Sequence, residues 1–287
     1  MERTLLTGAT GTLGRALRPR LVEAGHDVRA ASRSPPGTSA DNTGDAAETT
    51  AESVETVSES VEWVELDLAD GTGIESAVEG VDVVVHAATA PQGDSKVVDV
   101  SGTERLLDAA AAAGVSNFVY PSIVGIDEIP FSYYEHKLAA ERAIEEADVP
   151  ATILRATQFH EFVDDLLGMV SRLPVWPVAR GFRVQPVAAA EVADRLVDLA
   201  TPTASGRVSP MGGPAVLKSG DLARAYRAAR GTWRPIVGVP LPGGTARAFR
   251  AGKATCPDRA VGDETWEAWL ATRYSERSAA DSGAIPS

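Results

Sequence analysis

Apolar and polar residues in the first 160 positions form short runs that are typical of alternating strands and helices. Apolar or alternating runs typical of strands lie at residues 5–6, 26–33, 61–67, 81–88, 117–122 and 151–155. Helical patterns separate them at 15–24, 74–78, 102–113 and 134–146, and Gly25 and Gly114 end two of these helices. This alternation predicts an α/β fold with a doubly wound parallel sheet.

The pattern weakens after residue 155. Helical patterns lie at 191–200, 221–230 and 264–272, separated by stretches rich in proline and glycine such as 235–244. We therefore expect a nucleotide-binding domain at 1–160, a small C-terminal substrate lobe built from 161–274, and a polar tail at 275–287. Residues 35–60 contain six acidic residues and no basic one, which predicts a solvated surface insertion.

A glycine-rich turn joins the first strand to the first helix. It reads Thr7-Gly8-Ala9-Thr10-Gly11-Thr12-Leu13-Gly14. In such a turn the first glycine allows a tight bend, the second lets the backbone approach a diphosphate, and the third lets the helix pack near the strand. The helix N–H groups and dipole then favour an anion. The alternative is a turn without a ligand, but its position between a strand and a helix favours dinucleotide binding. A nucleotide-triphosphatase loop is excluded because no Gly-Lys-Ser/Thr follows.

The Thr-Gly-x-x-Gly-x-x-Gly spacing resembles the short-chain dehydrogenase/reductase superfamily, and within it the extended and atypical (NmrA-like) branch. Three further motifs carry the resemblance: Leu66-Asp67-Leu68, Val85-His86-Ala87-Ala88, and Gly102-Thr103 with Leu106-Leu107. It implies a Rossmann fold and an NAD(P) cofactor. The residues implied to hold the cofactor through these motifs are Thr7, Gly8, Thr10, Gly11, Thr12, Leu13, Gly14, Asp67, Leu68, Ala87 and Ala88.

The end of the second strand favours NADP over NAD. NAD-dependent enzymes usually place a carboxylate there for the ribose 2′-hydroxyl, whereas this chain has Ala31-Ser32-Arg33. Arg33 can pair with a 2′-phosphate and Ser32 can donate a hydrogen bond to it. We therefore predict that NADP is preferred, with NAD possible. The alternative is that Arg33 is a solvated surface residue.

Tyr133 and Lys137 form a Tyr-x-x-x-Lys pair, and Ser122 ends the strand before them. On a helix, residues four apart share a face. The resemblance implies that Ser122 polarises a carbonyl, Tyr133 exchanges the proton, and Lys137 binds the nicotinamide ribose. A cation about 4–5 Å away can lower a tyrosine pKa by the two to three units that this chemistry needs. We therefore expect Lys137 to lower the pKa of Tyr133.

Two departures from the family pattern weaken the catalytic hypothesis. The position where the family carries a helix-four asparagine matches Asp99, and the loop after the sixth strand reads Arg155-Ala156 instead of Arg-Pro. The alternative is that Tyr133 is a core or surface aromatic. Gln158 and His160 follow the sixth strand and are candidates to line a substrate pocket, although a packed histidine is the simpler interpretation of His160. Four dispersed histidines and one cysteine predict no metal site.

Charge and composition narrow the class of protein. The 287 residues carry a net charge of −13 with a pI near 4.8, which argues against a nucleic-acid partner. No apolar run of about 18 residues and no signal-peptide pattern are present, so we expect no membrane partner. A single cysteine fits a reducing compartment, and we expect a soluble cytoplasmic protein.

The function that these features favour is an NAD(P)-dependent oxidoreductase. It would transfer a hydride to or from a small carbonyl, alcohol or quinone-like substrate, with the cofactor supplying the hydride chemistry. One alternative is a non-catalytic NADP-sensing regulator of the NmrA-like kind, against which the Tyr133–Lys137 pair argues. Another is a nucleotide-sugar epimerase or dehydratase, for which the lobe after Arg155 is small.

Overall fold

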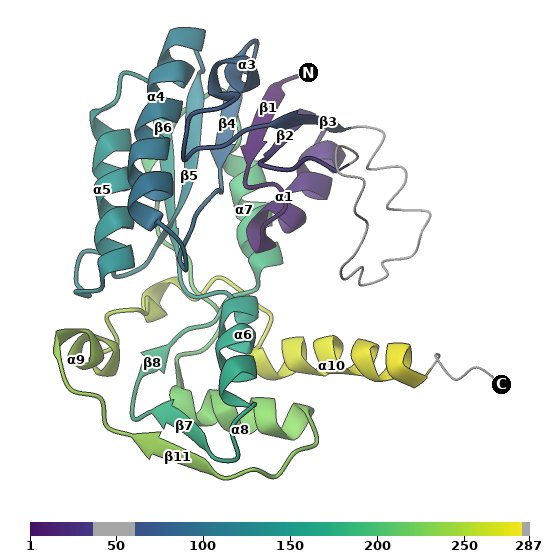
Figure 1. The fold of residues 1–287 in the computed structure, drawn as a ribbon, viewed down its shortest axis with the longest axis vertical. Coiled ribbons are helices and arrows are strands. Elements are labelled where there is room, and N and C mark those ends of the chain that lie inside the picture. The colour runs from purple at the N-terminus through teal and green to yellow at the C-terminus, as the bar shows by residue number, and fades with distance from the viewer. Residues whose placement is uncertain (37–60, 283–287) are drawn as a thin grey trace. The chain divides into compact units, whose positions relative to one another are not determined.

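The computed structural model describes residues 1–36 and 61–282, with side chains as far as Ser275. Most of the predicted acidic insertion lies outside the described residues. The chain divides into two compact units, each built from several segments (Figure 1). Unit 1 comprises Met1–Ser122, Ser132–Leu154 and Val192–Val208, and unit 2 comprises Ile123–Phe131, Arg155–Glu191 and Ser209–Ser287.

A seven-stranded sheet in the order β3-β2-β1-β4-β5-β6-β9 forms the centre of unit 1. The strands pair in parallel, as the doubly wound prediction requires, and the first six follow the Rossmann order. The sequence did not predict the seventh strand, which has only two residues. The strands are β1 (Arg3–Thr7), β2 (Asp27–Ser32), β3 (Val61–Glu65), β4 (Val83–His86), β5 (Asn117–Ile123), β6 (Ala151–Ala156) and β9 (Gly206–Arg207).

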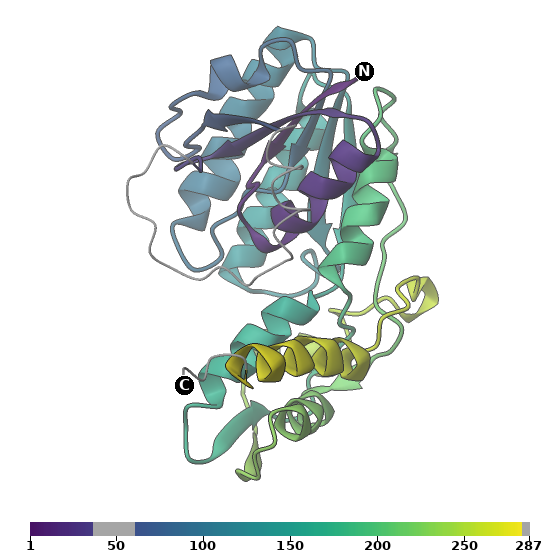
Figure 2. The same ribbon diagram turned by 90° about the vertical axis from the view of Figure 1, so that its right-hand side faces the viewer.

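Helices cover both faces of this sheet. Figures 1 and 2 show α3, α4 and α5 on one face and α1 and α7 on the other. Arg20 Nε on α1 donates to Asp194 Oδ1 on α7 at 2.6 Å. A π-helical turn, Lys96–Ser101, leads directly into α4 and was not predicted. The helices are α1 (Thr12–Glu23), α3 (Ile74–Val78), α4 (Gly102–Ala113), α5 (Ser132–Glu146) and α7 (Ala189–Leu199).

Unit 2 has its own core, in which Trp176, Tyr226 and Trp266 are fully buried. Its elements are α6 (His160–Val170), β7 (Trp176–Ala179), β8 (Arg183–Val184), β10 (Leu217–Lys218), α8 (Ser219–Ala229), β11 (Ile236–Val239), α9 (Gly244–Arg250), a 3-10 turn (Pro257–Arg259) and α10 (Trp266–Ser282). Strand β7 pairs with β11 in parallel, and β8 pairs with β10 in antiparallel orientation.

The sequence missed two helices of unit 2 and shortened a third. Helix α6 was missed although its acidic residues Glu161, Asp164 and Asp165 recur at helical spacing. Helix α9, which the sequence did not predict, begins directly after Gly243, at the end of the proline- and glycine-rich stretch 235–244. Residues 275–282, expected to begin a polar tail, continue α10.

Candidate functional site

The glycine turn after β1 brings three parts of the backbone close together. Gly8 has φ +67°, and a Cβ on it would lie 2.6 Å from the backbone nitrogen of Ala88, after β4. A Cβ on Gly14 would lie 2.1 Å from the carbonyl oxygen of Gly8. Both positions therefore require glycine, as the motif predicts.

The start of helix α1 leaves backbone donors available. Its N-cap is Gly11, which supplies no side-chain cap, and no acidic residue stands in the first turn. The first N–H groups of a helix have no intrahelical acceptor, and the dipole favours a negative group there. Gly11 and Thr10 are exposed and Thr12 is half-buried, whereas Leu13 packs in the core. The turn thus fits a diphosphate, with the bare backbone at Gly11 open to it.

A buried hydrogen-bond chain connects this turn to helix α4. Thr7 Oγ1 lies 2.7 Å from His86 Nδ1, and His86 Nε2 lies 3.0 Å from Thr103 Oγ1. Thr103 donates its own proton to the carbonyl oxygen of Asp99 at 2.8 Å, so it accepts from His86 Nε2–H. His86 therefore accepts the Thr7 proton at Nδ1. Burial, together with the smaller effect of the charge of Lys137, lowers the pKa of His86 to about 3, so the ring is neutral.

The residues expected to select and hold the adenosine half lie in unit 1. Ser32 ends β2, and its half-buried hydroxyl exchanges long hydrogen bonds of 3.3 Å with Ser34. Arg33 is exposed and has no ion-pair partner among the residues that the structure describes. Asp67 accepts the N–H of Ala69 at 2.8 Å in the turn after β3, and Leu68 is buried.

The serine, tyrosine and lysine predicted to be catalytic also lie in unit 1. Ser122, in β5, is 5% exposed, and its hydroxyl has no hydrogen-bond partner among the described residues. Lys137, in α5, is buried, and its Nζ donates to the carbonyl of Pro121 at 3.4 Å. The same Nζ lies 4.1 Å from the ring centre of Tyr120. Lys137 therefore lies against the end of β5, next to the residue that precedes Ser122.

The Tyr133 hydroxyl is held by a relay that the sequence did not predict. It lies 2.8 Å from Thr89 Oγ1, and Thr89 donates its own proton to Asp99 Oδ1 at 2.5 Å. Tyr133 is therefore the donor to Thr89. The other carboxylate oxygen of Asp99 accepts the N–H of Ala90 at 3.0 Å. Thr89 directly follows the Ala87-Ala88 motif, but nothing in its residue type marks it as a partner of Tyr133.

Asp99 links the tyrosine and the lysine. It stands in the π-helical turn before α4, and its side chain is fully buried. Its Oδ1 lies 4.0 Å from Lys137 Nζ. A buried carboxylate and a buried ammonium each compensate for the desolvation of the other. Single-turn π-helical segments often occur at functional sites, and this one carries the carboxylate shared by both groups.

The pKa of Tyr133 is shifted in the direction opposite to the one expected from the sequence. Burial raises the pKa of Tyr133 and the charge of Asp99 raises it further, against a smaller lowering by the Thr89 hydrogen bond. Lys137 is not among the groups that shift the pKa of Tyr133, contrary to the expectation, and its ammonium lies 4.0 Å from Asp99 Oδ1. Burial lowers the pKa of Lys137 to about 8, opposed by Asp99 and Glu141. A proton on Tyr133 is thus held firmly in the resting protein.

Gln158 and His160 lie in unit 2. His160 is fully buried, its Nε2 lies 3.1 Å from the carbonyl of Glu264, and its ring packs 5.6 Å from Trp266 and 5.7 Å from Trp269. This is the packed histidine that was the simpler interpretation. The amide of Gln158 is buried without a hydrogen-bond partner among the described residues.

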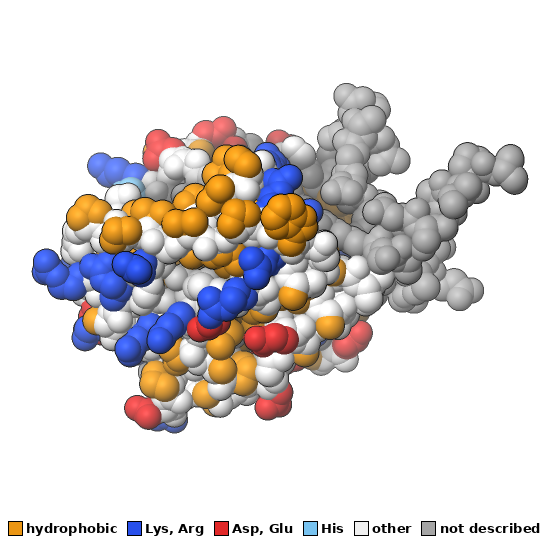
Figure 3. Space-filling model, turned by 90° about the horizontal axis from the view of Figure 1, so that it is seen from below, with side chains coloured by type: hydrophobic (Ala, Val, Ile, Leu, Met, Phe, Trp, Pro, Cys, Tyr) orange, Lys and Arg blue, Asp and Glu red, His pale blue; other side chains and the backbone are white. Residues whose placement is uncertain are grey.

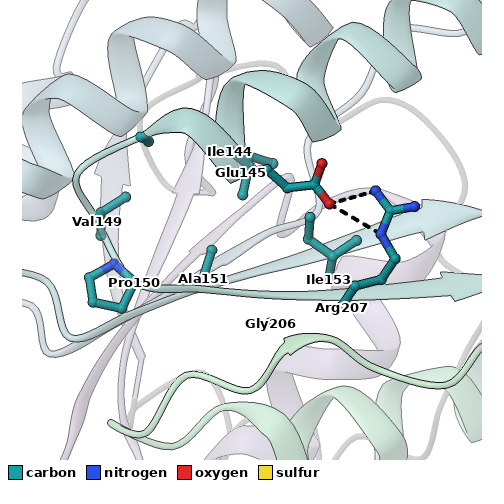
Figure 4. Close-up of a pocket in the computed structure, with 9 residues that line it drawn as sticks. Ile144, Glu145, Val149, Pro150, Ala151, Ile153, Gly206 and Arg207 are labelled. Carbon is teal, nitrogen blue, oxygen red and sulfur yellow. Dashed lines mark hydrogen bonds and ion pairs between the residues drawn. The ribbon is translucent and has the colours of Figure 1, made fainter.

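A cavity of about 310 Å³ borders the edge of the sheet in unit 1 (Figure 4). Apolar side chains of α5, β6 and the loop between them line it, and Arg207 bonds Glu145 at its rim at 2.6 and 3.2 Å. It reaches Ala151, where β6 begins, whereas the glycine turn follows the carboxyl end of β1. In a parallel sheet the start of β6 and the end of β1 lie at opposite ends of the strands, so this cavity is separate from the predicted site.

Two further searches concern metals and membranes. In residues 1–36 and 61–282, no group of three or more His, Cys, Asp or Glu side chains is arranged to hold a metal ion. No described helix has both the length and the apolar character needed to cross a bilayer.

The sequence of residues 8–202 matches a family model described as NAD(P)H-binding. This match covers more than half of the chain.

The chain belongs to this NAD(P)H-binding family.

Among curated relatives, a 3β-hydroxysteroid dehydrogenase/Δ5→4-isomerase of Mycobacterium tuberculosis is 30% identical over 173 residues. The match covers 50% of this chain and 42% of that protein. The chain spans less than half the length of the curated relatives it matches.

Solved structures share the fold of this NAD(P)H-binding protein. A short-chain dehydrogenase/reductase superfamily protein of Agrobacterium tumefaciens with bound NAD gives a TM-score of 0.70 at 21% identity, covering 98% of this chain and 99% of that one. An NADPH-dependent quinone oxidoreductase of Escherichia coli gives 0.65 at 16% identity, covering 94% and 99%. The fold is thus that of the short-chain dehydrogenase/reductase superfamily, as the glycine motif indicated.

Proposed function

We propose that the protein is an oxidoreductase that prefers NADP(H) and transfers a hydride to or from a small carbonyl, alcohol or quinone-like substrate. The main support is the arrangement of Tyr133, Thr89, Asp99 and Lys137. A hydrogen-bonded chain runs from the Tyr133 hydroxyl through Thr89 to the carboxylate of Asp99. That carboxylate lies 4.0 Å from the ammonium of Lys137, which packs against β5. A proton donor, a relay and a buried cation thus share unit 1 with the glycine turn.

The preference for NADP(H) is supported by the end of β2. Arg33 is exposed, and no carboxylate among the described residues engages it. Among the described residues, the hydroxyl of Ser32 makes only the two 3.3 Å hydrogen bonds with Ser34, which a bound phosphate could replace. A charge-assisted bond from Arg33 to a 2′-phosphate stabilises NADP by roughly 1.5–3 kcal/mol, which corresponds to about tenfold or more in affinity.

Each proposed catalytic side chain has a distinct role. The bound cofactor supplies or accepts the hydride. The Ser122 hydroxyl, free of protein partners among the described residues, donates to the substrate oxygen. Tyr133 holds the proton that is exchanged with that oxygen, and Thr89 and Asp99 form the route by which the tyrosine recovers or releases it. Lys137 balances the charge of Asp99 and binds the nicotinamide ribose.

Relatives with related chemistry support this proposal. The dehydrogenase/isomerase of Mycobacterium tuberculosis and the quinone oxidoreductase of Escherichia coli carry names that describe redox activities. Their chemistry is compatible with a tyrosine, lysine and serine set beside a dinucleotide.

The test is NADPH oxidation with a panel of ketones, aldehydes and quinones. Tyr133→Phe removes the exchanged proton and should lower turnover about 10²- to 10⁴-fold while leaving NADPH affinity unchanged. Tyr134→Phe, which removes the hydroxyl of the buried neighbouring residue, is the matched control and should keep turnover near the wild-type value. Full activity of Tyr133→Phe would refute the proposed acid–base role.

A further inference from the structure

Basic and acidic residues are strongly segregated along this acidic chain. Residues 166–184 and 216–253, all in unit 2, hold eleven lysines and arginines and a single acidic residue, Asp221. All eleven are exposed except the half-buried Arg227. Within the part of the chain that the structure describes, only Arg224 and Lys253 of this group pair with a carboxylate, those of Asp221 and Glu128. Unit 2 therefore carries a concentrated positive charge that the net charge of −13 conceals.

Large apolar side chains are exposed among these basic residues. Trp233 is 88% exposed, and Leu173, Val175 and Val237 are 47%, 42% and 50% exposed. Figure 3, which views the face carrying β7, β11 and α8, shows a band of hydrophobic side chains bordered by lysine and arginine side chains. Soluble proteins rarely leave such side chains together in water without a partner.

The β7–β11 ribbon holds part of this surface in place. Val237 is the register partner of Pro177, and both are exposed. Val175 directly precedes β7 and is 42% exposed. Trp176 and Val178 alternate with them and are buried in the unit 2 core. The ribbon thus anchors one face in the core and presents the other to its surroundings.

Arg234 joins the two loops that extend this surface. Its Nη1 donates to the carbonyl of Ser171 at 2.9 Å and to that of Leu173 at 2.8 Å. Arg227 donates in turn to the carbonyl of Arg234 at 3.1 Å. Trp233 and Leu173 are therefore held on neighbouring loops by fixed hydrogen bonds. We call the set Leu173, Val175, Pro177, Trp233 and Val237 the ribbon surface.

We propose that the ribbon surface docks the protein on an anionic lipid bilayer. Exposed aliphatic side chains and a tryptophan insert at the boundary between headgroups and acyl chains, where tryptophan is enriched. Arg172, Arg180 and Arg234, which flank the ribbon, would meet the lipid phosphates, and each basic group near such a surface strengthens binding roughly fivefold. The proposal does not depend on the oxidoreductase activity.

Two other occupants fit this surface less well. A symmetric dimer through the ribbon surface would bring the same positive charges of two copies together, which is unfavourable. A nucleic acid would engage the arginines but would leave the aliphatic row in water. From the sequence we expected no membrane partner, but neither the lack of a long apolar run nor the net charge reports where the charges lie on the surface.

Vesicle co-sedimentation of the full chain tests the proposal. The protein should sediment with vesicles that contain phosphatidylglycerol, not with phosphatidylcholine alone, and raised salt should release it. The double variant Leu173→Ser/Trp233→Ser should weaken sedimentation about tenfold or more, since it removes two side chains that would be buried in lipid. Val261→Ser is the matched control, because Val261 is 60% exposed outside the ribbon surface.

Tryptophan fluorescence gives a second readout. Emission should shift to the blue on anionic vesicles, and Trp233→Phe should abolish the shift while retaining sedimentation. Failure of the wild-type protein to bind anionic vesicles would overturn the proposal, as would equal binding by the double variant. A wild-type dimer that the double variant converts to a monomer would make this surface a subunit interface and would equally overturn it.

Discussion

Lys137 Nζ lies 4.0 Å from Asp99 Oδ1, and both side chains are almost completely buried. The same Asp99 oxygen accepts a hydrogen bond from Thr89 Oγ1, and Thr89 Oγ1 accepts one from the Tyr133 hydroxyl. One carboxylate thus opposes the ionisation of Tyr133 and stabilises the charge of Lys137. The protonation states of the tyrosine and the lysine are therefore coupled through a residue that the family pattern gives as asparagine.

Asp99→Asn should separate these effects. It leaves a buried ammonium without this carboxylate, so the free energy of unfolding at neutral pH should fall by about 3–5 kcal/mol. The pKa of Lys137 should fall below its present value of about 8, and that of Tyr133 should also fall. Denaturant unfolding and the pH profile of turnover measure the two effects. Asp108→Asn, an exposed position on α4, is the control, and an unchanged pH profile in Asp99→Asn would contradict the coupling.

Lys137 should make stability depend on pH above neutrality. Its pKa of about 8 in the folded protein lies below its ordinary value of 10.5. Between these values the unfolded chain holds the proton and the folded chain does not, so stability rises as pH increases through this window. The difference in unfolding free energy between wild type and Lys137→Met should change by up to about 3 kcal/mol from pH 7.5 to 10.5. A difference that stays constant with pH would show that Lys137 is not strongly desolvated.

Gly8 should be far less tolerant of a side chain than an open glycine. Gly8→Ala combines a left-handed backbone with a clash against Ala88, whereas Gly25→Ala has φ +87° and meets nothing within 4 Å. Gly25→Ala should therefore lose about 1 kcal/mol of stability, and Gly8→Ala clearly more, together with NADPH binding. Thermal unfolding and NADPH titration of both variants check this. Equal losses in the two would mean that the close approach at Ala88 is unimportant.

Arg33 should control the choice of dinucleotide. Arg33→Ala should weaken NADPH about tenfold or more and leave NADH unchanged, because only NADPH carries the 2′-phosphate. Competitive titration with both dinucleotides gives the ratio. Arg15, which bonds the carbonyl of Thr10 at the same turn, provides a control: Arg15→Ala should affect both dinucleotides similarly. An NADH preference in the wild-type protein would refute the role of Arg33.

The sequence predicted the parts of the fold that local patterns determine. The apolar strand runs and glycine stops of unit 1 correspond to β1–β6 and their helices, because a parallel sheet buries its strands on both faces. The two-residue β9 and the π-helical turn carry no such pattern. In unit 2, α6 was missed although Glu161, Asp164 and Asp165 recur at helical spacing.

Only part of the candidate site could be predicted, because only some of its residues belong to a local sequence pattern. Motif spacing indicated Gly8, Ser122, Tyr133 and Lys137, since each follows a strand end or shares a helix face. Thr89 belongs to no recognised spacing, and its contact with Tyr133 joins residues 44 positions apart. The direction of the pKa shift of Tyr133 could not be predicted, because it depends on the burial of the hydroxyl and on the charge of Asp99, which only the tertiary structure sets.

The most direct test of dinucleotide binding at the first helix is calorimetric titration of NADPH into wild type and Gly11→Val. Gly11 has φ −73°, which any residue adopts, so the variant should fold while its side chain occupies the space of the diphosphate. The account predicts saturable binding of one NADPH per chain to wild type and its loss in Gly11→Val. It would be contradicted by a wild-type protein that binds neither NADPH nor NADH at millimolar concentration, or by a variant that binds as well as wild type.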